Sequence, residues 1–375
     1  MAARSRSPSR RDESLTRSFR RLIAMFVVSA ALTAVGPGAI AASLARAAGT
    51  PAYQFDISVE TPCVSGRGPA DQPLTAVVRS QNGAKLGSTT VGVGSNGHWA
   101  ACFPGVIIEP GMSLTARHAG QHRRLVVPPL TLRTDRPSDV LSGRAPVGQA
   151  LRLTLTRCVF TEPCLVKHYA VTPDSAGHYA DDVSAESYPW DLEGGDRAVI
   201  GFTTDAGDSI HADSVAELMR VVSPDRVILQ IYPPGSTVSV RLLAADGSMR
   251  ATQRITATTA GPYAFRFVKD GKPVTIQPGN AIRASFSPDA RITWPHVRLV
   301  GHPATGHVSG VCLKDMQLQV TVGGSAGLSL EQMAGSDGSF DVDFSSLGGV
   351  QSGDVLHLVC RADTGDRVEF QSVVP

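Results

Sequence analysis

The sequence predicts an all-β protein in which four tandem antiparallel β-sandwich repeats follow an N-terminal signal peptide. Two glycine landmarks recur with a common period of about 80 residues, which indicates tandem copies of one unit. Inside each unit, apolar residues alternate with polar ones, as in half-buried strands. Glycine and proline are frequent, at 37 and 25 residues of 375, and only 18% of the residues are charged. This composition suits many short strands joined by tight turns.

The chain begins with a segment typical of a secretory signal peptide, residues 1–47. Basic, serine-rich residues 1–21 precede a continuous apolar stretch at 22–35, and small-x-small cleavage sites follow at 39–41 and 45–47. The alternative is an uncleaved membrane anchor, but the apolar stretch is shorter than the about 20 residues that a spanning helix needs. We therefore expect an exported protein, secreted or held at the cell surface, with no membrane span in its mature part.

Removal of this segment changes the charge of the protein. The whole chain has a formal net charge of +2, but residues 1–47 contain eight arginines and two acidic residues, so the mature part carries −4. Binding to a phosphate backbone depends on clustered Lys and Arg. We therefore expect no nucleic-acid partner, and a protein or glycan partner outside the cell that the sequence does not identify.

Each unit contains a turn that leads into an aromatic strand. The first landmark is a glycine followed two residues later by an aromatic residue: Gly97 and Trp99, Gly177 and Tyr179, Gly261 and Tyr263, Gly338 and Phe340. The second landmark is a later turn glycine: Gly111, Gly195, Gly279 and Gly353. Glycine suits such turns because it adopts positive φ without strain. We expect the aromatic side chains to pack between the sheets as core anchors.

The period places the four repeats at residues 48–133, 134–219, 220–300 and 301–375. Alternating apolar residues predict strands within them, most clearly at 237–243, 263–267, 316–322 and 340–344. The pair Asp246-Gly247 predicts a hairpin turn after the first of these strands. Roughly six or seven short strands per unit are typical of a small antiparallel β-sandwich.

All six cysteines lie in the mature part and are even in number, which predicts disulfides in an exported protein. They are Cys63, Cys102, Cys158, Cys164, Cys312 and Cys360. Fifteen connectivities are possible, and proximity within a repeat favours 63–102, 158–164 and 312–360. Metal binding is the alternative, but the spacings contain no C-x₂-C pair. We expect no metal and no cofactor.

A loop in the second repeat is the leading candidate for ligand binding. Tyr188 and Trp190 place two aromatic side chains in the long segment between the two landmarks. Such a loop could stack on a sugar or bind a partner, since loops often carry binding function, or it could cover the edge of its own sandwich. The acidic residues Asp205, Asp208 and Asp213 could bind Ca²⁺ through carboxylate oxygens, or could be solvated turn residues.

Histidines form two further candidate groups. His296, His302 and His307 surround the boundary between the third and fourth repeats and could bind a transition metal, although their spacing matches no known site. His118 and His122 lie in a basic stretch that reads more simply as a solvated turn. We expect no hydrolase nucleophile turn and no catalytic residues.

The turns resemble those of tandem bacterial immunoglobulin-like or carboxypeptidase-regulatory-like β-sandwich repeats. The resembling residues are Ala-Asp-Gly at 245–247, Asp-Gly-Ser-Phe at 337–340 and Gly-Asp-Val at 353–355. The first repeat departs from the pattern, with Gly111-Met112 in place of a glycine followed by an acidic residue. The second repeat has the segment from Cys158 to Cys164 in place of its first hairpin turn. The resemblance implies a role in adhesion, spacing or ligand display, with no shared catalytic residues.

Together these observations predict an exported, non-catalytic repeat protein with a binding, adhesion or scaffold role at the cell surface or outside the cell. A carbohydrate-binding module protein is the first alternative and would use Tyr188 and Trp190. A secreted hydrolase is the second alternative and would need a polar cleft.

Overall fold

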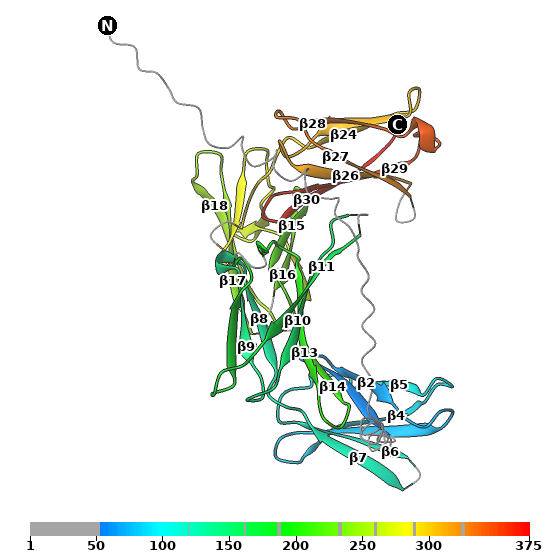
Figure 1. Ribbon diagram of the computed structural model, residues 1–375. Coiled ribbons are helices and arrows are strands. Elements are labelled where there is room, and N and C mark those ends of the chain that lie inside the picture. Colours follow the sequence, from blue (N-terminus) through cyan, green and yellow to red (C-terminus); the bar gives the residue numbers. More distant parts are fainter. Residues whose placement is uncertain are drawn as a thin grey trace, which may run out of the picture. The chain divides into compact units, whose positions relative to one another are not determined.

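The computed structural model describes residues 53–118, 120–160, 163–185, 189–231, 235–258, 261–287, 290–323 and 327–375 (Figure 1). The described residues contain strands β1 to β30, two short 3₁₀ helices, η2 (Arg136–Ser138) and η3 (Ser345–Leu347), and no α-helix. The predicted all-β fold class is confirmed. No helix in these ranges is long and apolar enough to cross a membrane. The expected signal peptide lies outside the described residues.

The strands form four β-sandwiches, each with a three-stranded and a four-stranded sheet. We number the sandwiches 1 to 4 along the chain. Sandwich 1 pairs β1 (Gln54–Val59), β2 (Cys63–Arg67) and β5 (His98–Cys102) with the sheet β4 (Lys85–Gly92), β3 (Pro73–Arg79), β6 (Ser113–His118) and β7 (Gln121–Val126). Sandwich 2 pairs β8 (Thr131–Asp135), β9 (Val140–Arg144) and β12 (His178–Asp182) with the sheet β11 (Leu165–Val171), β10 (Leu151–Arg157), β13 (Arg197–Thr203) and β14 (Ser209–Val215).

The later sandwiches repeat this order of strands. Sandwich 3 pairs β15 (Leu218–Ser223), β16 (Arg226–Ile231) and β19 (Gly261–Phe265) with the sheet β18 (Met249–Thr256), β17 (Thr237–Leu243), β22 (Ala281–Ala284) and β23 (Arg291–Thr293), and adds a hairpin of β20 (Val268–Lys269) and β21 (Lys272–Pro273). Sandwich 4 pairs β24 (Arg298–His302), β25 (His307–Val311) and β28 (Ser339–Asp343) with the sheet β27 (Leu328–Met333), β26 (Gln317–Val322), β29 (Val355–Arg361) and β30 (Arg367–Val373).

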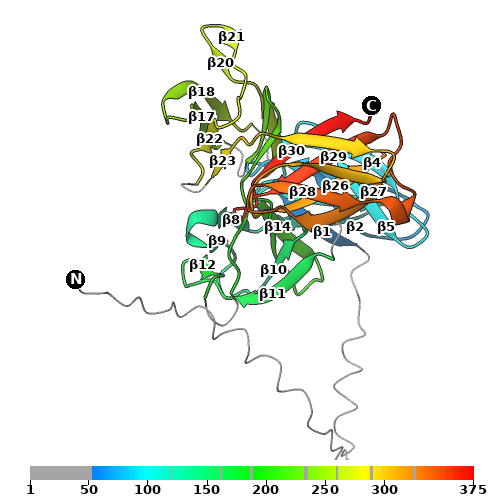
Figure 2. The same cartoon turned by 90° about the horizontal axis from the view of Figure 1, so that it is seen from above.

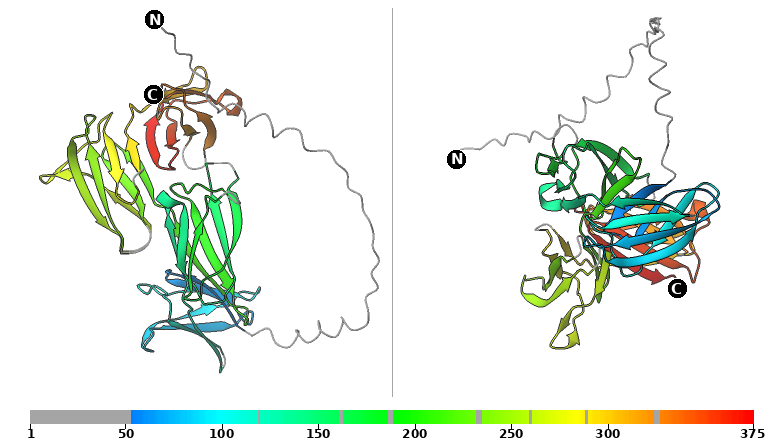
Figure 3. Two further views of the ribbon diagram at one scale, coloured as in Figure 1. Left: turned by 60° about the vertical axis from the view of Figure 1, so that its left-hand side comes forward. Right: turned by 90° about the horizontal axis from the view of Figure 1, so that it is seen from below.

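Two sheets continue from one sandwich into another. The last strand of sandwich 2, β14, pairs in parallel with the first strand of sandwich 1, β1. The last strand of sandwich 4, β30, pairs in the same way with the first strand of sandwich 3, β15. Each junction creates a seven-stranded sheet. Figure 2 shows β30, β29, β26 and β27 of the second one, and Figure 3 shows the same ribbon from two further sides. The buried apolar side chains form one cluster over sandwiches 1 and 2 and another over sandwiches 3 and 4.

The aromatic residues of the first landmark pack in these cores, as predicted. Trp99, Tyr179 and Phe340 are buried, and Tyr263 is only partly buried. A glycine on the second strand lies directly opposite each buried ring: Gly66, Gly143 and Gly310. A Cβ atom there would lie only 2.0 Å from the cross-strand carbonyl oxygen and under 3 Å from ring atoms. In sandwich 3 the residue directly opposite Tyr263 is Leu229 instead of a glycine. The leucine side chain therefore prevents the tyrosine ring from packing against the backbone of that strand.

The turn glycines adopt the positive φ that the sequence predicts. Gly97, Gly177 and Gly338 have φ of 78°, 77° and 83°, and Gly111, Gly195, Gly279 and Gly353 have φ between 85° and 92°. Gly261 also has a positive φ, but at 141° it lies well outside the range of the other turn glycines. In the second turn the residue after the glycine accepts a hydrogen bond from the backbone three residues earlier, as in Gln277 N to Asn280 Oδ1 at 3.0 Å. The repeat period therefore reflects two recurrent turn structures.

The three predicted disulfides are present. Cys63 and Cys102 lie directly opposite each other on β2 and β5 of one sheet, and Cys158–Cys164 closes the β10–β11 loop. Cys312–Cys360 joins the two sheets of sandwich 4 across its core. Cys312 directly follows β25, the second strand of sandwich 4.

Candidate functional site

In the loop that the sequence singled out for ligand binding, the described aromatic side chain is buried. Tyr188 lies outside the described residues. The Trp190 side chain is buried, and its Nε1 donates to Asp196 Oδ2 at 2.9 Å. Arg157 Cζ lies 5.0 Å and Lys167 Nζ 5.4 Å from the indole ring centroid. The ring is thus buried and lies beneath two cationic side chains, so Trp190 provides no exposed surface on which a sugar could stack.

The backbone around Trp190 explains this position. Trp190 N donates to Val183 O at 2.7 Å, and Leu192 N donates to the Asp139 carboxylate at 2.7 Å. Both bonds hold the segment against its own sandwich instead of letting it extend as a free loop. The simpler of the two sequence interpretations, a segment that covers the sandwich edge, describes Trp190 better than ligand binding does.

An ion-pair network runs from Trp190 to sandwich 4. Arg157 donates from Nε to Asp196 Oδ1 at 2.8 Å and from Nη2 to Asp196 Oδ2 at 2.6 Å. Arg157 also pairs with Glu193 through its Nη1, and Arg361 on β29 pairs with the second oxygen of Glu193. Glu193 therefore bridges an arginine of sandwich 2 and an arginine of sandwich 4.

A second buried ion pair lies beside this network. Arg136 Nη2 is 3.1 Å from Asp366 Oδ2, with side-chain exposures of 1% and 0%. Asp366 Oδ1 also accepts from Met219 N at 2.8 Å, and Arg136 Nη1 donates to Glu217 O at 2.9 Å. We call the residues Arg136, Glu193, Glu217, Arg361 and Asp366 the joint. The joint connects sandwich 2 to both sandwich 3 and sandwich 4.

Close backbone approach completes the joint. Gly194 N donates to Thr364 O at 2.8 Å. A Cβ atom on Gly365 would lie 2.5 Å from Gly194 O, and one on Gly194 would lie 3.0 Å from Glu217 O. Only glycine fits such contacts between two backbones. The turn that carries Asp366 therefore contacts sandwich 2 through both its side chains and its backbone.

A related arrangement connects sandwiches 1 and 2. Asp208 Oδ1 accepts from Phe55 N at 2.9 Å, and its Oδ2 pairs with Arg123 at 2.5 Å. Asp208 precedes β14 as Asp366 precedes β30, and Phe55 lies on β1 as Met219 lies on β15. In both cases a buried aspartate in the last hairpin of an even-numbered sandwich holds the backbone of the first strand of the odd-numbered one.

Burial dominates the electrostatics of the joint. Burial raises the pKa of Glu193 although Arg361 and Arg157 lower it. It raises the pKa of Asp366 against the opposing effect of Arg136, and that of Glu217 to about 7. Burial and the neighbouring Arg361 charge lower the pKa of Arg367. Glu193 and Asp366 are arranged in hydrogen-bonded ion pairs with arginines, an arrangement that fixes relative position and orientation.

The other sequence candidates do not assemble into metal sites. Within the described ranges no group of three or more His, Cys, Asp or Glu side chains is arranged to hold a metal ion. Asp208 belongs to the junction above, and Asp213 pairs with Arg197 and accepts from Ser58 at 3.1 Å. Asp205 lies exposed in the same turn. The Ca²⁺ interpretation therefore fails because the carboxylates serve different partners.

The histidines are used singly. His302 Nε2 lies 2.7 Å from Ser309 Oγ, and His307 Nδ1 lies 3.1 Å from Asp341 Oδ1. His118 Nδ1 lies 2.6 Å from Pro73 O. His296 precedes β24, and His122 is exposed on β7.

Sequence reasoning missed the joint. The signal was present as a second copy of the Asp-x-Gly-Asp turn: residues 205–208 recur as 363–366. The recurrence in the last hairpin of alternate repeats could have marked both turns as structural. Taken alone, the acidic spacing of the first copy suggested a cation site.

Comparisons with known proteins give no family. No model of a known protein family matches the chain, and no curated protein matches it. Among solved structures, a tetra-tandem repeat from the extending region of a large adhesion protein covers 86% of this chain and 98% of its own, at 14% identity and a TM-score of 0.17. A structure that concerns host cell surface retention of a 1.5-MDa bacterial ice-binding adhesin matches at 12% identity and a TM-score of 0.18. The match covers 86% of this chain and 96% of the other.

A further structure, the BSP domain of a biofilm-associated protein, matches at 7% identity and a TM-score of 0.17, covering 86% of this chain and 96% of its own. These TM-scores are too low for the likenesses to carry any argument about this chain.

Proposed function

We propose that this chain is an exported, non-catalytic scaffold that holds four β-sandwich repeats in fixed relation and displays their surfaces at the cell surface or outside the cell. The single observation that supports the proposal most is the construction of the junctions. Two of them are parallel strand pairings, β14 with β1 and β30 with β15. The third is the joint, with its buried Arg136–Asp366 ion pair.

Such junctions differ from ordinary linkers between domains. Domains in one chain are expected to move relative to each other unless their interface is large and apolar. Here backbone hydrogen bonds continue through the sheet, and Asp208 and Asp366 each bind a backbone amide of the neighbouring sandwich. A protein whose sandwiches acted independently would have no use for these contacts. A scaffold for adhesion or display needs them.

Two features support export. Residues 1–47 have the pattern of a signal peptide. The described residues contain three disulfides and no free cysteine, and disulfides persist mainly in oxidising compartments. The proposed repeats are those expected from the sequence, at residues 48–133, 134–219, 220–300 and 301–375, with each boundary falling inside the first strand of the next sandwich, β8, β15 or β24.

The proposal is tested by measuring a distance distribution between sandwiches. Spin labels are attached through unnatural amino acids at Val147 and Met249, which are 64% and 61% exposed and lie in sandwiches 2 and 3. We expect a narrow distribution in the unaltered chain and a broad one in Asp366→Ala. The control is Asp363→Ala, which alters an exposed residue of the same turn. A broad distribution in the unaltered chain would overturn the proposal.

A further inference from the structure

The outer face of one sheet in sandwich 3 carries a row of arginines. On the sheet β18-β17-β22-β23, Arg241 lies directly opposite Arg283, and Arg283 lies directly opposite Arg291. Neighbouring strands are about 4.8 Å apart, so the three arginine side chains project side by side from adjacent strands. Arg254, on β18, projects from the same face. It lies directly opposite Ser239, which precedes Arg241 by two residues on β17. All four arginines are exposed. We call these four residues the arginine face.

This arrangement costs stability inside the fold. Like charges directly opposite each other on neighbouring strands destabilise a sheet. The described part of the chain provides no ion pair or hydrogen bond to any of the four side chains. By contrast, Arg266 in the same sandwich pairs with Asp225 at 3.2 Å. Among the described residues, nothing balances the charge of the arginine face, and an anion from outside the chain would balance it.

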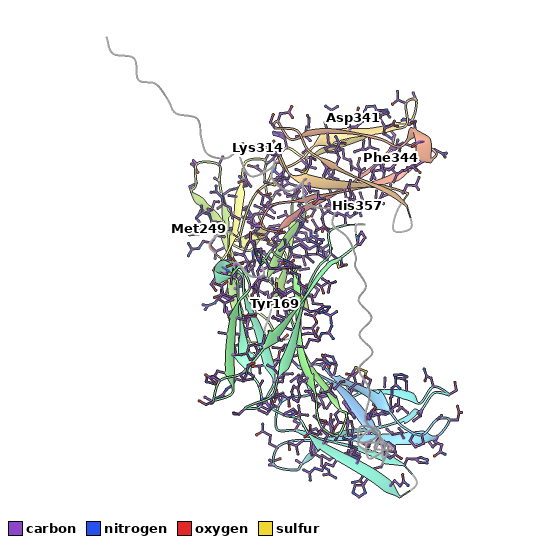
Figure 4. All side chains as sticks on the ribbon, viewed as in Figure 1. Tyr169, Met249, Lys314, Asp341, Phe344 and His357 are labelled. Carbon is purple, nitrogen blue, oxygen red and sulfur yellow. A yellow bond between two sulfur atoms is a disulfide. The ribbon has the colours of Figure 1, made fainter. Side chains whose placement is uncertain are left out.

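The surroundings of the arginine face narrow the kind of anion. Its outward neighbours include the hydroxyl side chains of Thr237, Ser239, Thr252 and Thr293, together with the small Ala281 and the half-buried Leu243. A stable protein interface has an apolar core, and single-stranded nucleic acid binds through aromatic platforms. The exposed large apolar residue on these four strands is Met249, at the end of β18 (Figure 4). Guanidinium groups interspersed with hydroxyls suit a polymer that carries both acidic groups and hydroxyls.

A second basic face occupies the corresponding sheet of sandwich 1. Across β4-β3-β6-β7, directly opposite residues form the row Thr90, Thr75, Arg117 and His122. The row lines a shallow hollow of about 700 Å³. Arg124 lies on the same strand as His122, two residues further on. The two basic faces thus combine arginines with threonine hydroxyls on equivalent sheets.

The two repeats that carry the basic faces are also the two with an excess of basic residues. Residues 48–133 contain 7 Lys and Arg against 4 Asp and Glu, and residues 220–300 contain 11 against 4. Residues 134–219 contain 6 against 14, and residues 301–375 contain 3 against 9. Basic and acidic repeats therefore alternate, and the basic faces are separated along the chain. A long polymer could contact both, which raises its affinity by multivalency, whereas a small anion could not.

We propose that the arginine face of sandwich 3, assisted by the basic face of sandwich 1, binds an acidic polysaccharide, one that carries sulfate or carboxylate groups. This inference rests on the proposed function and names the partner class of the scaffold. Binding is electrostatic and releases counterions, so it weakens steeply as salt rises. The neighbouring hydroxyls hydrogen-bond to the sugar hydroxyls and distinguish the glycan from a plain polyanion.

The experiment measures binding of the full mature chain to heparin and to polygalacturonate over a series of salt concentrations. The test variant is Arg241→Gln, Arg283→Gln and Arg291→Gln. The control variant is Lys269→Gln, Lys272→Gln and Arg298→Gln, which removes the same charge from exposed positions outside the arginine face.

We expect the unaltered chain and the control to bind both polysaccharides. In the test variant, the slope of log affinity against log salt should fall in magnitude by about two to three. The test variant should melt at the same or a higher temperature, because the opposed like charges are gone. This second readout separates a binding role from a structural one, since removal of structural arginines would lower the melting temperature.

Four results would overturn the inference. The first is equal binding by the test and control variants, and the second is no binding by the unaltered chain. The third is equal affinity for polyphosphate of matched length, which carries no sugar hydroxyls. The fourth is salt-sensitive self-association in sedimentation that the test variant loses, since the partner would then be a second copy of the chain. A chain with a narrow distance distribution that binds no polysaccharide leaves the scaffold proposal standing.

Discussion

Replacing Asp366 by alanine tests the physical account of the joint. The substitution removes the acceptor of Met219 N and leaves Arg136 without its carboxylate, in a site where the two side chains are 1% and 0% exposed. Loss of one partner from a buried ion pair costs about 3 to 5 kcal/mol, because the remaining charge cannot reach water. Asp208→Ala should cost less, about 1 to 3 kcal/mol, because its partner Arg123 is 17% exposed.

Native-state hydrogen exchange measures this cost locally in the full chain. The amides of Met219 and Gly194 report on the joint, since they donate to Asp366 and to Thr364. In Asp366→Ala, both should lose roughly a hundredfold to a thousandfold of their protection, while amides in sandwich 1 keep theirs. The double variant Arg136→Met with Asp366→Leu should recover most of it, because it leaves no buried charge unpaired.

Two results would refute this reasoning. A protection loss below about tenfold in Asp366→Ala would mean that the ion pair is hydrated or that the joint is formed by other contacts. Equal effects of Asp366→Ala and Asp208→Ala would mean that exposure of the arginine partner does not set the cost.

Three further predictions concern packing, crosslinks and pH. Gly143→Ala should destabilise sandwich 2 by about 2 kcal/mol or more in urea unfolding, since its Cβ would meet a carbonyl oxygen at 2.0 Å, whereas Gly92→Ala, which meets nothing within 4 Å, should be neutral. Reduction of Cys312–Cys360, whose two cysteines have a sequence separation of 48, should destabilise sandwich 4 by about 4 kcal/mol in thiol-dependent unfolding and leave sandwich 3 nearly unchanged. Burial raises the pKa of Glu217 to about 7 from 4.5, so the folded joint binds a proton more readily than the unfolded chain. The stability of the joint should therefore fall as pH rises from 4.5 to 7 and level off above, and Glu217→Gln should flatten this dependence in exchange measured at pH 5 and pH 8.

The features that the sequence predicts are those with a local cause. A turn that needs positive φ selects glycine wherever it recurs, so the period of Gly111 and its counterparts is visible without a structure. An aromatic residue at a fixed distance from the turn must face the core, which predicts Trp99. The disulfides follow because each pair lies within one repeat. Local geometry and repetition together determine the fold class.

The joint depends on contacts between distant residues, and single-sequence patterns carry little information about these. Arg136 and Asp366 are 230 residues apart. Trp190 reads as an exposed loop residue because nothing near it in sequence reveals Arg157 above its ring. Asp208 reads as a cation ligand because a carboxylate that accepts a backbone amide has the same sequence signature as one that binds Ca²⁺.

Sandwich 3 departs from its neighbours in a way that connects these observations. Leu229 stands where the other sandwiches have a glycine opposite the aromatic anchor, and Tyr263 is only partly buried as a result. No cysteine lies in residues 220–300, so no disulfide compensates. The same sandwich carries the opposed arginines, which weaken it further. A purely structural repeat would gain from losing those charges, and proteins keep destabilising features mainly where function requires them. The least reinforced sandwich is therefore the place where a binding surface best explains the sequence.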